Sequence, residues 1–166
     1  MSYAVVFSSR TGNTELLAKT IREALGAEGC VYFGVPDAAA LQADTLYVGF
    51  WTDKGTCDER IAGFLQNLAG KRVFLFGTAG FGGAQAYFDQ ILASAARNLP
   101  EGAVEIGRLM CQGKMPEVVR QRYEAMEESP RRQAMLENFD QARSHPDAAD
   151  LEHVRFAVAQ AGRQTV

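Results

Sequence analysis

Short apolar runs alternate with helix-type patterns along most of the chain. The runs are rich in β-branched and aromatic residues, which is typical of buried strands. Five of them are predicted to be strands, at residues 3–7, 31–33, 46–51, 73–76 and 104–110. Apolar residues recur at helical spacing between them, with predicted helices around residues 17–25, 61–68 and 88–95. This alternation predicts one α/β domain over residues 1–166, with a parallel sheet covered on both faces.

Local signals indicate where these helices begin and end. Gly26 and Gly70 suit the position just after a helix, because glycine adopts left-handed backbone conformations at little cost. Thr56 followed by Glu59 predicts a capping box, with Thr56 at the start of the second helix.

The last third of the chain is polar and helical. Residues 116–143 contain Ser129 and Pro130, which suit a helix cap and a first helical position, and a final helix is expected from Pro146. The apolar side of 116–143 either packs on the sheet or forms part of a docking surface or dimer contact. Packing on the sheet is the favoured interpretation, since most amphipathic helices pack in this way.

Composition narrows the class of protein. The chain of 166 residues is 47% hydrophobic and 22% charged, which is ordinary for a globular protein and excludes a disordered or fibrous one. A net charge of −3 does not fit a nucleic-acid binder. No apolar run approaches the length that spans a membrane, and no signal peptide is recognisable. We therefore expect a cytoplasmic protein that binds neither nucleic acid nor membranes.

The cysteines and histidines do not form a recognisable catalytic or metal-binding set. No Cys-x-x-Cys pair exists, and His145 and His153 are expected at the surface, so no metal site is predicted. The odd cysteine count fits a reducing cytoplasm. Cys57 lies beside a helix start, which lowers thiol pKa, and Cys111 is expected just after the fifth strand. Neither has a histidine or second cysteine beside it, so no catalytic residue is predicted.

A polar loop directly follows the first strand. It combines hydroxyl groups, an amide, a glycine and the free N–H groups of a helix start, and these favour an anion. The Gly-x-x-x-x-Gly-Lys and Gly-x-Gly-x-x-Gly patterns are absent, so the loop suits one terminal phosphate rather than a pyrophosphate. The alternative is that it only caps the first helix. The loop residues are Ser9, Arg10, Thr11, Gly12, Asn13 and Thr14.

The pattern Ser9-x-Thr11-Gly12-Asn13-Thr14 after an amino-terminal strand resembles the FMN phosphate loop of the flavodoxin family. This resemblance implies a doubly wound five-stranded parallel sheet of order 2-1-3-4-5, here with an extra C-terminal helical segment. It also implies that the five named residues carry the phosphate of FMN. Arg10 departs from much of the family and either pairs with the phosphate or lies at the surface.

The flavin ring would need flat apolar walls near the ends of the third and fourth predicted strands. Trp51 and Phe81 are the candidates, the alternatives being strand-end packing for Trp51 and a core position for Phe81. Glycines between Gly77 and Gly83 would let the backbone pass close to the ring. The family's Trp-Gly-Asp order is not reproduced here. The remaining predicted ring contacts are Thr52, Gly55, Thr78, Ala79, Gly80 and Gly82.

In flavodoxins the loop after the third strand changes peptide orientation on reduction, and residues 52–55 would be the corresponding turn, with Gly55 as its flexible point. The acidic residues Asp53, Asp58 and Glu59 lie near this turn in sequence, and Lys54 partly offsets their charge. Carboxylates around the ring would disfavour an anionic flavin and make it a strong reductant. The alternative is that they form a solvated helix start, where acids are favoured anyway.

The leading functional hypothesis is an FMN-binding protein that carries electrons from a reductase to an acceptor enzyme through small, transient interfaces. We expect a monomer or weak dimer. Two alternatives stay open: an FMN-dependent NAD(P)H:quinone-type oxidoreductase on the same fold, and a cofactor-free flavodoxin-like interaction module.

Overall fold

A five-stranded parallel sheet of order β2-β1-β3-β5-β6 forms the centre of the computed structural model, which describes residues 2–82 and 84–163. A short strand, β4 (Thr56–Cys57), pairs antiparallel with the end of β3 and lies off this path. Without β4 the order is the predicted 2-1-3-4-5, so the doubly wound fold is confirmed. The parallel strands are β1 (Tyr3–Phe7), β2 (Cys30–Gly34), β3 (Thr45–Asp53), β5 (Arg72–Ala79) and β6 (Val104–Gln112).

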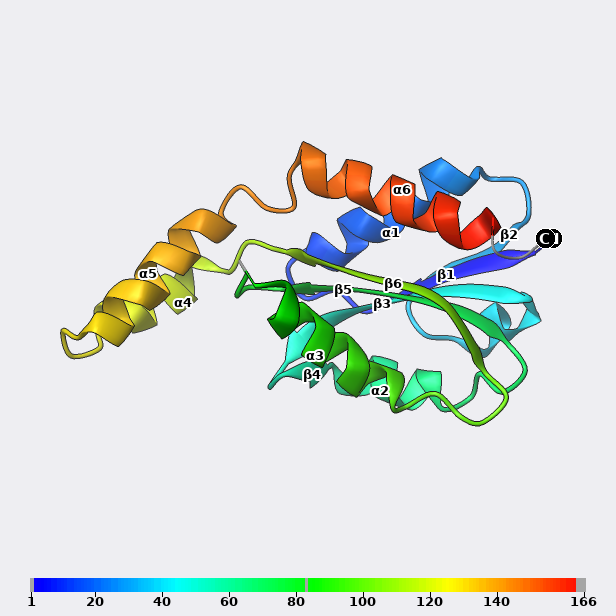
Figure 1. The fold of residues 1–166 in the computed structure, drawn as a ribbon, viewed down its shortest axis with the longest axis horizontal. Coiled ribbons are helices and arrows are strands. Elements are labelled where there is room, and N and C mark those ends of the chain that lie inside the picture. Colours follow the sequence, from blue (N-terminus) through cyan, green and yellow to red (C-terminus); the bar gives the residue numbers. More distant parts are fainter. Residues whose placement is uncertain (1, 83, 164–166) are drawn as a thin grey trace.

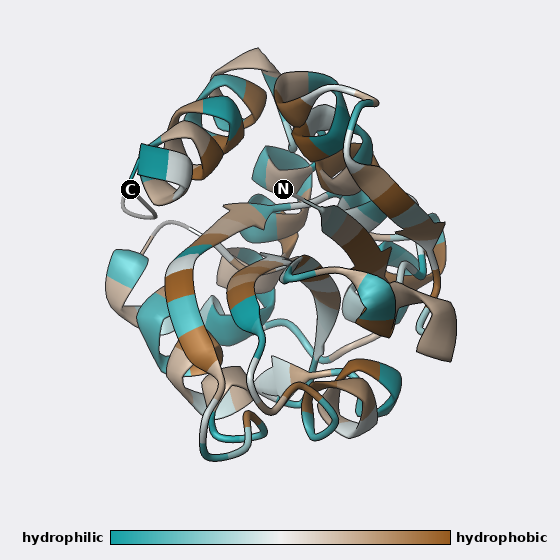
Figure 2. Ribbon diagram, turned by 90° about the vertical axis from the view of Figure 1, so that its right-hand side faces the viewer, coloured by the Kyte–Doolittle hydropathy of each residue, from teal (hydrophilic) through white to brown (hydrophobic). Residues whose placement is uncertain are grey.

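Helices cover both faces of the sheet (Figure 1). One face carries α1 (Asn13–Leu25) and α6 (Ala148–Arg163), and the other carries α2 (Glu59–Leu65) and α3 (Gln85–Ala96). A short 3₁₀ helix, η1 (Ala38–Gln42), precedes β3. Figure 2 looks from the end where both termini lie and shows the most hydrophobic ribbon in the sheet between these helices. Among the described residues, no helix is both long enough and apolar enough to cross a membrane.

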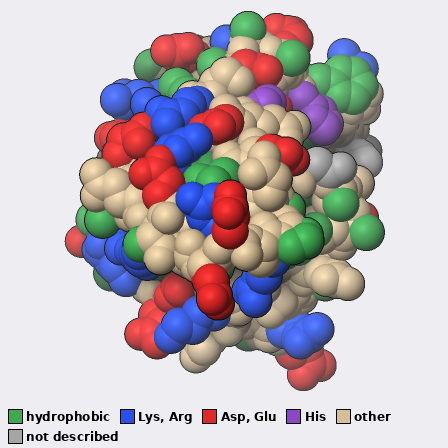
Figure 3. All heavy atoms as spheres, turned by 90° about the vertical axis from the view of Figure 1, so that its left-hand side faces the viewer, with side chains coloured by type: hydrophobic (Ala, Val, Ile, Leu, Met, Phe, Trp, Pro, Cys, Tyr) green, Lys and Arg blue, Asp and Glu red, His purple; other side chains and the backbone are tan. Residues whose placement is uncertain are grey.

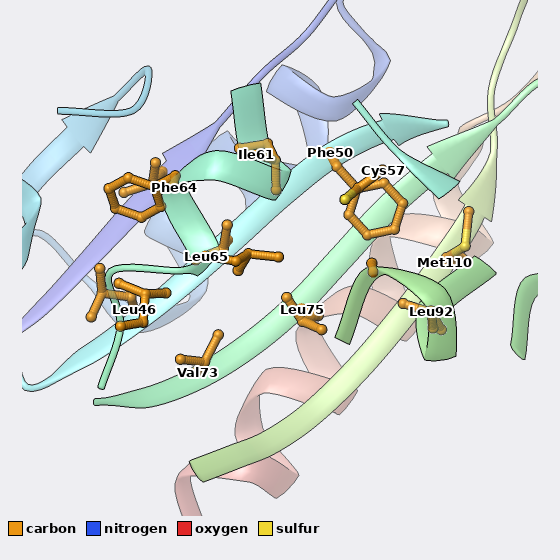
Figure 4. Packing of buried hydrophobic residues seen from close by; sticks show 14 of the residues in the cluster. Leu46, Phe50, Cys57, Ile61, Phe64, Leu65, Val73, Leu75, Leu92 and Met110 are labelled. Carbon is orange, nitrogen blue, oxygen red and sulfur yellow. The ribbon is translucent and has the colours of Figure 1, made fainter. Parts of the chain in front are cut away.

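The two faces of the sheet have separate hydrophobic clusters. The cluster under α2 and α3 includes Phe50, Leu65 and Leu92 (Figure 4), and the cluster under α1 and α6 includes Phe76 and Val158. Because successive side chains of a strand point to opposite faces, β3 and β5 contribute to both clusters. Such near-continuous apolar strands are what the sequence pattern predicted for a sheet buried on both sides.

Two further helices form an arm beyond the carboxyl ends of the strands (Figure 1). They are α4 (Glu117–Glu124) and α5 (Pro130–Ala142). The predicted cap of α5 is confirmed, because the Ser129 side chain accepts a hydrogen bond from the N–H of Arg132. The expected packing of this segment on the sheet is wrong. Its apolar side chains pack within the arm, in a small cluster of Tyr123, Leu136 and Phe139 flanked by Met115, Val119 and Met135.

The start of α2 differs from the prediction. Thr56 belongs to β4 and does not cap the helix; Asp58 does, accepting a hydrogen bond from the N–H of Ile61. The cause is the antiparallel pairing with β3, which keeps Thr56 extended. The helix also ends earlier than predicted, at Leu65, and β6 runs longer, so that Cys111 lies within the strand.

Candidate functional site

The loop between β1 and α1 lies at the carboxyl edge of the sheet, where doubly wound folds bind their ligands. Gly12 has φ of +90°, precedes the first residue of α1, and has open space where a Cβ would stand. The hydroxyl oxygen of Ser9 accepts hydrogen bonds from the N–H groups of Gly12 (3.1 Å) and Glu15 (3.3 Å). Ser9 therefore shapes the loop as well as lying in it.

Free backbone donors remain in the same loop. The N–H groups of Thr11, Asn13 and Thr14 have no hydrogen-bond partner in residues 2–82 and 84–163. N–H groups at a helix start, together with the helix dipole, attract an anion. The backbone of the loop therefore offers hydrogen-bond donors of the kind that attract an anion.

The side chains of Asn13 and Thr14 face the protein interior. The Asn13 amide donates to the carbonyl of Lys114 (2.8 Å) and to the hydroxyl of Thr11 (3.0 Å). The Thr14 hydroxyl donates to the carbonyl of Phe50 (3.2 Å), and its oxygen lies 2.9 Å from the hydroxyl oxygen of Thr78. Of the predicted loop residues, these two offer a ligand their backbone N–H groups, while Thr11 also offers a hydroxyl.

A cavity of about 460 Å³ opens beside the loop, within the size range of small-molecule sites. It lies between the ends of β3 and β5 on one side and the arm on the other. A smaller cavity of about 110 Å³ shares several lining residues with it and also reaches Asn13, Thr78 and Lys114. The larger cavity is lined by Arg10, Thr11, Trp51, Thr52, Lys54, Gly55, Ala79, Gly80, Phe81, Tyr87, Met115, Pro116, Val118, Val119 and Arg122.

Most of the residues predicted for a flavin ring line this cavity. Trp51 is half-buried, and the Arg10 guanidinium lies 5.4 Å from the centre of its ring. Phe81 is 40% exposed, which excludes the alternative of a core position. The structure does not place Gly82 in either cavity lining. Tyr87 and the lining residues between 115 and 122 are not among the predicted contacts. The signal in residues 115–122 is an apolar pattern, which by itself predicts packing.

The glycines after β5 make room for side chains of the protein itself. A Cβ on Gly80 would lie 2.5 Å from the sulfur of Met115, and one on Gly82 would lie 2.6 Å from the Gln112 side chain. Asn138 on α5 donates to the carbonyl of Gly80 (3.1 Å) and accepts from the N–H of Gly82 (3.3 Å). These contacts fasten the arm to the body. Gly83, also expected near a ring, lies outside the described residues.

The turn predicted at residues 52–55 is a tight hairpin. Asp53 pairs with Thr56, and the two residues between them, Lys54 and Gly55, have φ of +52° and +82°. Positive φ at both central positions is the geometry that matches the twist of paired strands. The hairpin carries both Lys54 and Gly55 to the mouth of the cavity.

The charge of the cavity lining is opposite to the one expected. Among the described residues, the charged side chains that line it are those of the cations Arg10, Lys54 and Arg122. The predicted acids do not line it. Asp58 is buried at the start of α2, where its carboxylate accepts the N–H groups of Trp51 (3.3 Å) and Ile61 (3.4 Å). Burial raises the pKa of Asp58, against hydrogen bonds that lower it.

The cysteines are not placed for chemistry. Cys57 and Cys111 are buried, and burial raises the pKa of both thiols, to about 12 for Cys111. The expected lowering of the Cys57 pKa by the helix start is therefore wrong, because loss of hydration outweighs it. His145 is half-buried and its Nδ1 lies 2.6 Å from a carboxylate oxygen of Asp150. The carboxylates of Asp150 and Asp147 each accept a hydrogen bond from the backbone N–H of the other residue at the start of α6 (2.9 Å each), so this cluster serves to cap a helix.

The chain belongs to the flavodoxin family: the model described as "Flavodoxin domain" matches residues 4–159. It is 45% identical to the flavodoxin-like domain-containing protein BilS of Clostridium symbiosum (strain WAL-14163), over 91% of this chain and 90% of that protein. Among solved structures, oxidised flavodoxin 2 from Bacillus cereus covers 98% of this chain and 99% of its own, with 20% identity and a TM-score of 0.53. A flavoprotein from Lactobacillus acidophilus NCFM in complex with FMN covers 66% of this chain and 92% of its own, with 14% identity and a TM-score of 0.52.

Proposed function

We propose that this protein binds FMN at the carboxyl edge of its sheet and carries electrons between a reductase and an acceptor enzyme. The observation that carries the proposal is the set of N–H groups of Thr11, Asn13 and Thr14, which have no partner among the described residues, beside an aromatic-lined cavity of about 460 Å³. An anion site next to a wide apolar cavity fits a flat ring with a phosphate tail. Family membership and the FMN-bound flavoprotein of the same fold support this choice of cofactor.

The chain's own residues divide the binding between them. The loop N–H groups and the Thr11 hydroxyl would hold the phosphate, and Asn13 and Thr14 keep the loop in shape from beneath. Trp51 and Phe81 on the body and Val119 on the arm would provide walls for the ring. FMN supplies reversible acceptance of electrons, and the protein sets its orientation, exposure and electrostatic surroundings.

A carrier needs no acid or base on the protein, because the flavin supplies the redox chemistry. The described residues of the cavity lining include two threonines, a tyrosine and three cations. Electrons would leave through the open side of the cavity, in a short-lived contact with a partner protein. A cytoplasmic location and a monomeric or weakly dimeric state stay predictions from the sequence.

The test begins with the visible spectrum of the purified chain after incubation with FMN, where we expect the bands of bound oxidised flavin. Thr11→Val is then compared with Thr20→Val, the same chemical change within α1, at a hydroxyl that donates to the carbonyl of Leu16. Hydrogen bonds to charged groups contribute about 1.5–3 kcal/mol, so Thr11→Val should weaken FMN binding by about 10- to 100-fold. Binding of riboflavin, which lacks the phosphate, should not change.

Three results would overturn the proposal. A protein that stays colourless with FMN would favour the cofactor-free interaction module. If Thr11→Val weakens the binding of FMN and of riboflavin equally, the loop does not bind the phosphate. Bleaching of the bound flavin by NAD(P)H alone would replace the carrier with the reductase alternative, whereas bleaching only through a separate reductase supports the carrier.

A further inference from the structure

The three cations of the cavity come from three separate parts of the fold. Arg10 lies in the loop after β1, Lys54 at the tip of the β3–β4 hairpin, and Arg122 in the last turn of α4. Val118 precedes Arg122 by four residues, so both lie on the same side of α4 and both line the cavity. The tertiary fold therefore gathers positive charge that is scattered along the sequence.

None of these cations is neutralised by an ion pair in the described part of the chain. Arg10 instead lies against the ring of Trp51. Two acids lie next to lining residues in the sequence. Glu117 forms an ion pair with Arg143, and Asp53 does not line the cavity. Figure 3 views the molecule from the side of the arm and shows Lys, Arg, Asp and Glu side chains intermingled on this outer face.

We propose that Arg10, Lys54 and Arg122 bind the reduced, anionic form of FMN more tightly than neutral residues would, and so make the bound flavin a weaker reductant. This inference rests on the proposed function. Two electrons from the reductase and one proton convert the neutral oxidised ring into an anion with a single negative charge. Cations in the lining attract that charge and attract the neutral oxidised ring far less. The carboxylates expected from the sequence would have had the opposite effect.

The size of the effect follows from exposure. All three side chains are exposed, so water and salt screen each of them. We expect each cation to change the ratio of the dissociation constants of oxidised and reduced FMN by about 3- to 10-fold, well below the value for a buried charge. Removing all three should change the ratio by more than any single replacement.

The test measures dissociation constants for oxidised FMN and, without oxygen, for dithionite-reduced FMN, together with the midpoint potential of the bound flavin. Arg122→Gln should weaken binding of reduced FMN by about 3- to 10-fold more than binding of oxidised FMN, and lower the potential accordingly. Arg122→Lys should retain most of the wild-type ratio. The matched control is Arg131→Gln, which removes the same charge from an exposed site on α5 outside the cavity lining.

Each outcome separates the two proposals. If Arg122→Gln weakens both forms equally, or shifts their ratio no more than Arg131→Gln does, the electrostatic inference is wrong while FMN binding stands. If the wild-type chain binds neither form, the proposed function itself fails. The inference is supported if the dissociation constant of oxidised FMN divided by that of reduced FMN falls in Arg122→Gln. It should fall further in the triple variant Arg10→Gln, Lys54→Gln, Arg122→Gln.

Discussion

Asn13 and Thr14 hold the first loop in place from the interior. Their side chains connect α1 to the segment after β6, to β3 and to β5, through Lys114, Phe50 and Thr78. The same two residues expose backbone N–H groups on the other side of the loop. A resemblance between sequences identifies such residues as important, but it does not distinguish a side chain that contacts a ligand from one that shapes the loop.

The reactivity of the three cysteine thiols tests how far each side chain is buried. Cys30 is half-buried, whereas Cys57 and Cys111 are only 4% and 3% exposed. We expect a thiol reagent such as DTNB to modify Cys30 in the folded protein and all three cysteines after unfolding. Burial also raises the pKa of Cys111 to about 12, so this thiol stays almost entirely protonated between pH 7 and 9 and should remain unmodified in the folded protein over that range. Cys30→Ser should abolish the reaction of the folded protein with DTNB. A reaction that persists in this variant would contradict the burial of Cys57 and Cys111.

On the neighbouring strands β3 and β5, each of two glycines lies opposite an aromatic residue. Gly49 on β3 lies opposite Phe76 on β5, and Phe50 on β3 lies opposite Gly77 on β5. A Cβ on Gly49 would lie 2.2 Å from the Phe76 ring, and one on Gly77 would lie 2.4 Å from the Phe50 ring. Each ring therefore packs over a glycine of the neighbouring strand, Phe50 on one face of the sheet and Phe76 on the other. These glycines are required by packing.

This packing can be tested with two glycine substitutions. Gly77→Ala should lower the free energy of unfolding by about 1–3 kcal/mol, because the buried Phe50 ring has to move. Gly63→Ala is the control: Gly63 is exposed on α2 with nothing within 4 Å of its Cβ position, and this change should stabilise the protein by about 0.4–1 kcal/mol. Denaturant unfolding measures both. Equal stability of the two variants would mean that the ring does not require Gly77.

At the scale of the whole molecule, the cavity of about 460 Å³ lies between two parts that pack separately. The body has its clusters on the two faces of the sheet, and the arm has its own around Phe139. Hydrogen bonds of Asn138 to Gly80 and Gly82 join them beside the cavity. A ligand in the cavity would contact both parts and so stabilise their arrangement.

Filling the cavity should stabilise body and arm together. With FMN at about 100 times its dissociation constant, we expect the free energy of unfolding to rise by about 2.7 kcal/mol. Amide hydrogen exchange should slow both in the loop before α1 and in α4, because both line the cavity. Riboflavin at the same multiple of its own dissociation constant should protect α4 but not the loop. Protection of the loop alone would show that α4 takes no part in binding.

The sequence by itself determined the parts of this protein that depend on local pattern. Buried strands and amphipathic helices follow from the spacing of apolar residues, and the loop from Ser9 to Thr14 is recognisable because a helix start and its polar residues are contiguous. Even so, local pattern failed where a distant partner decided: Thr56 resembles a helix cap, but its pairing with Asp53 makes it a strand residue.

Only the tertiary structure decided what closes the site and what charge lines it. The arm lies across the carboxyl ends of the strands because Asn138 and Met115 meet the glycines after β5, residues that are distant in sequence. That arrangement brings Arg122 to the same cavity as Arg10 and removes Asp58 to a buried cap. The physical reason is that a side chain's electrostatic effect depends on its distance and burial in space, and contacts between segments far apart along the chain set both.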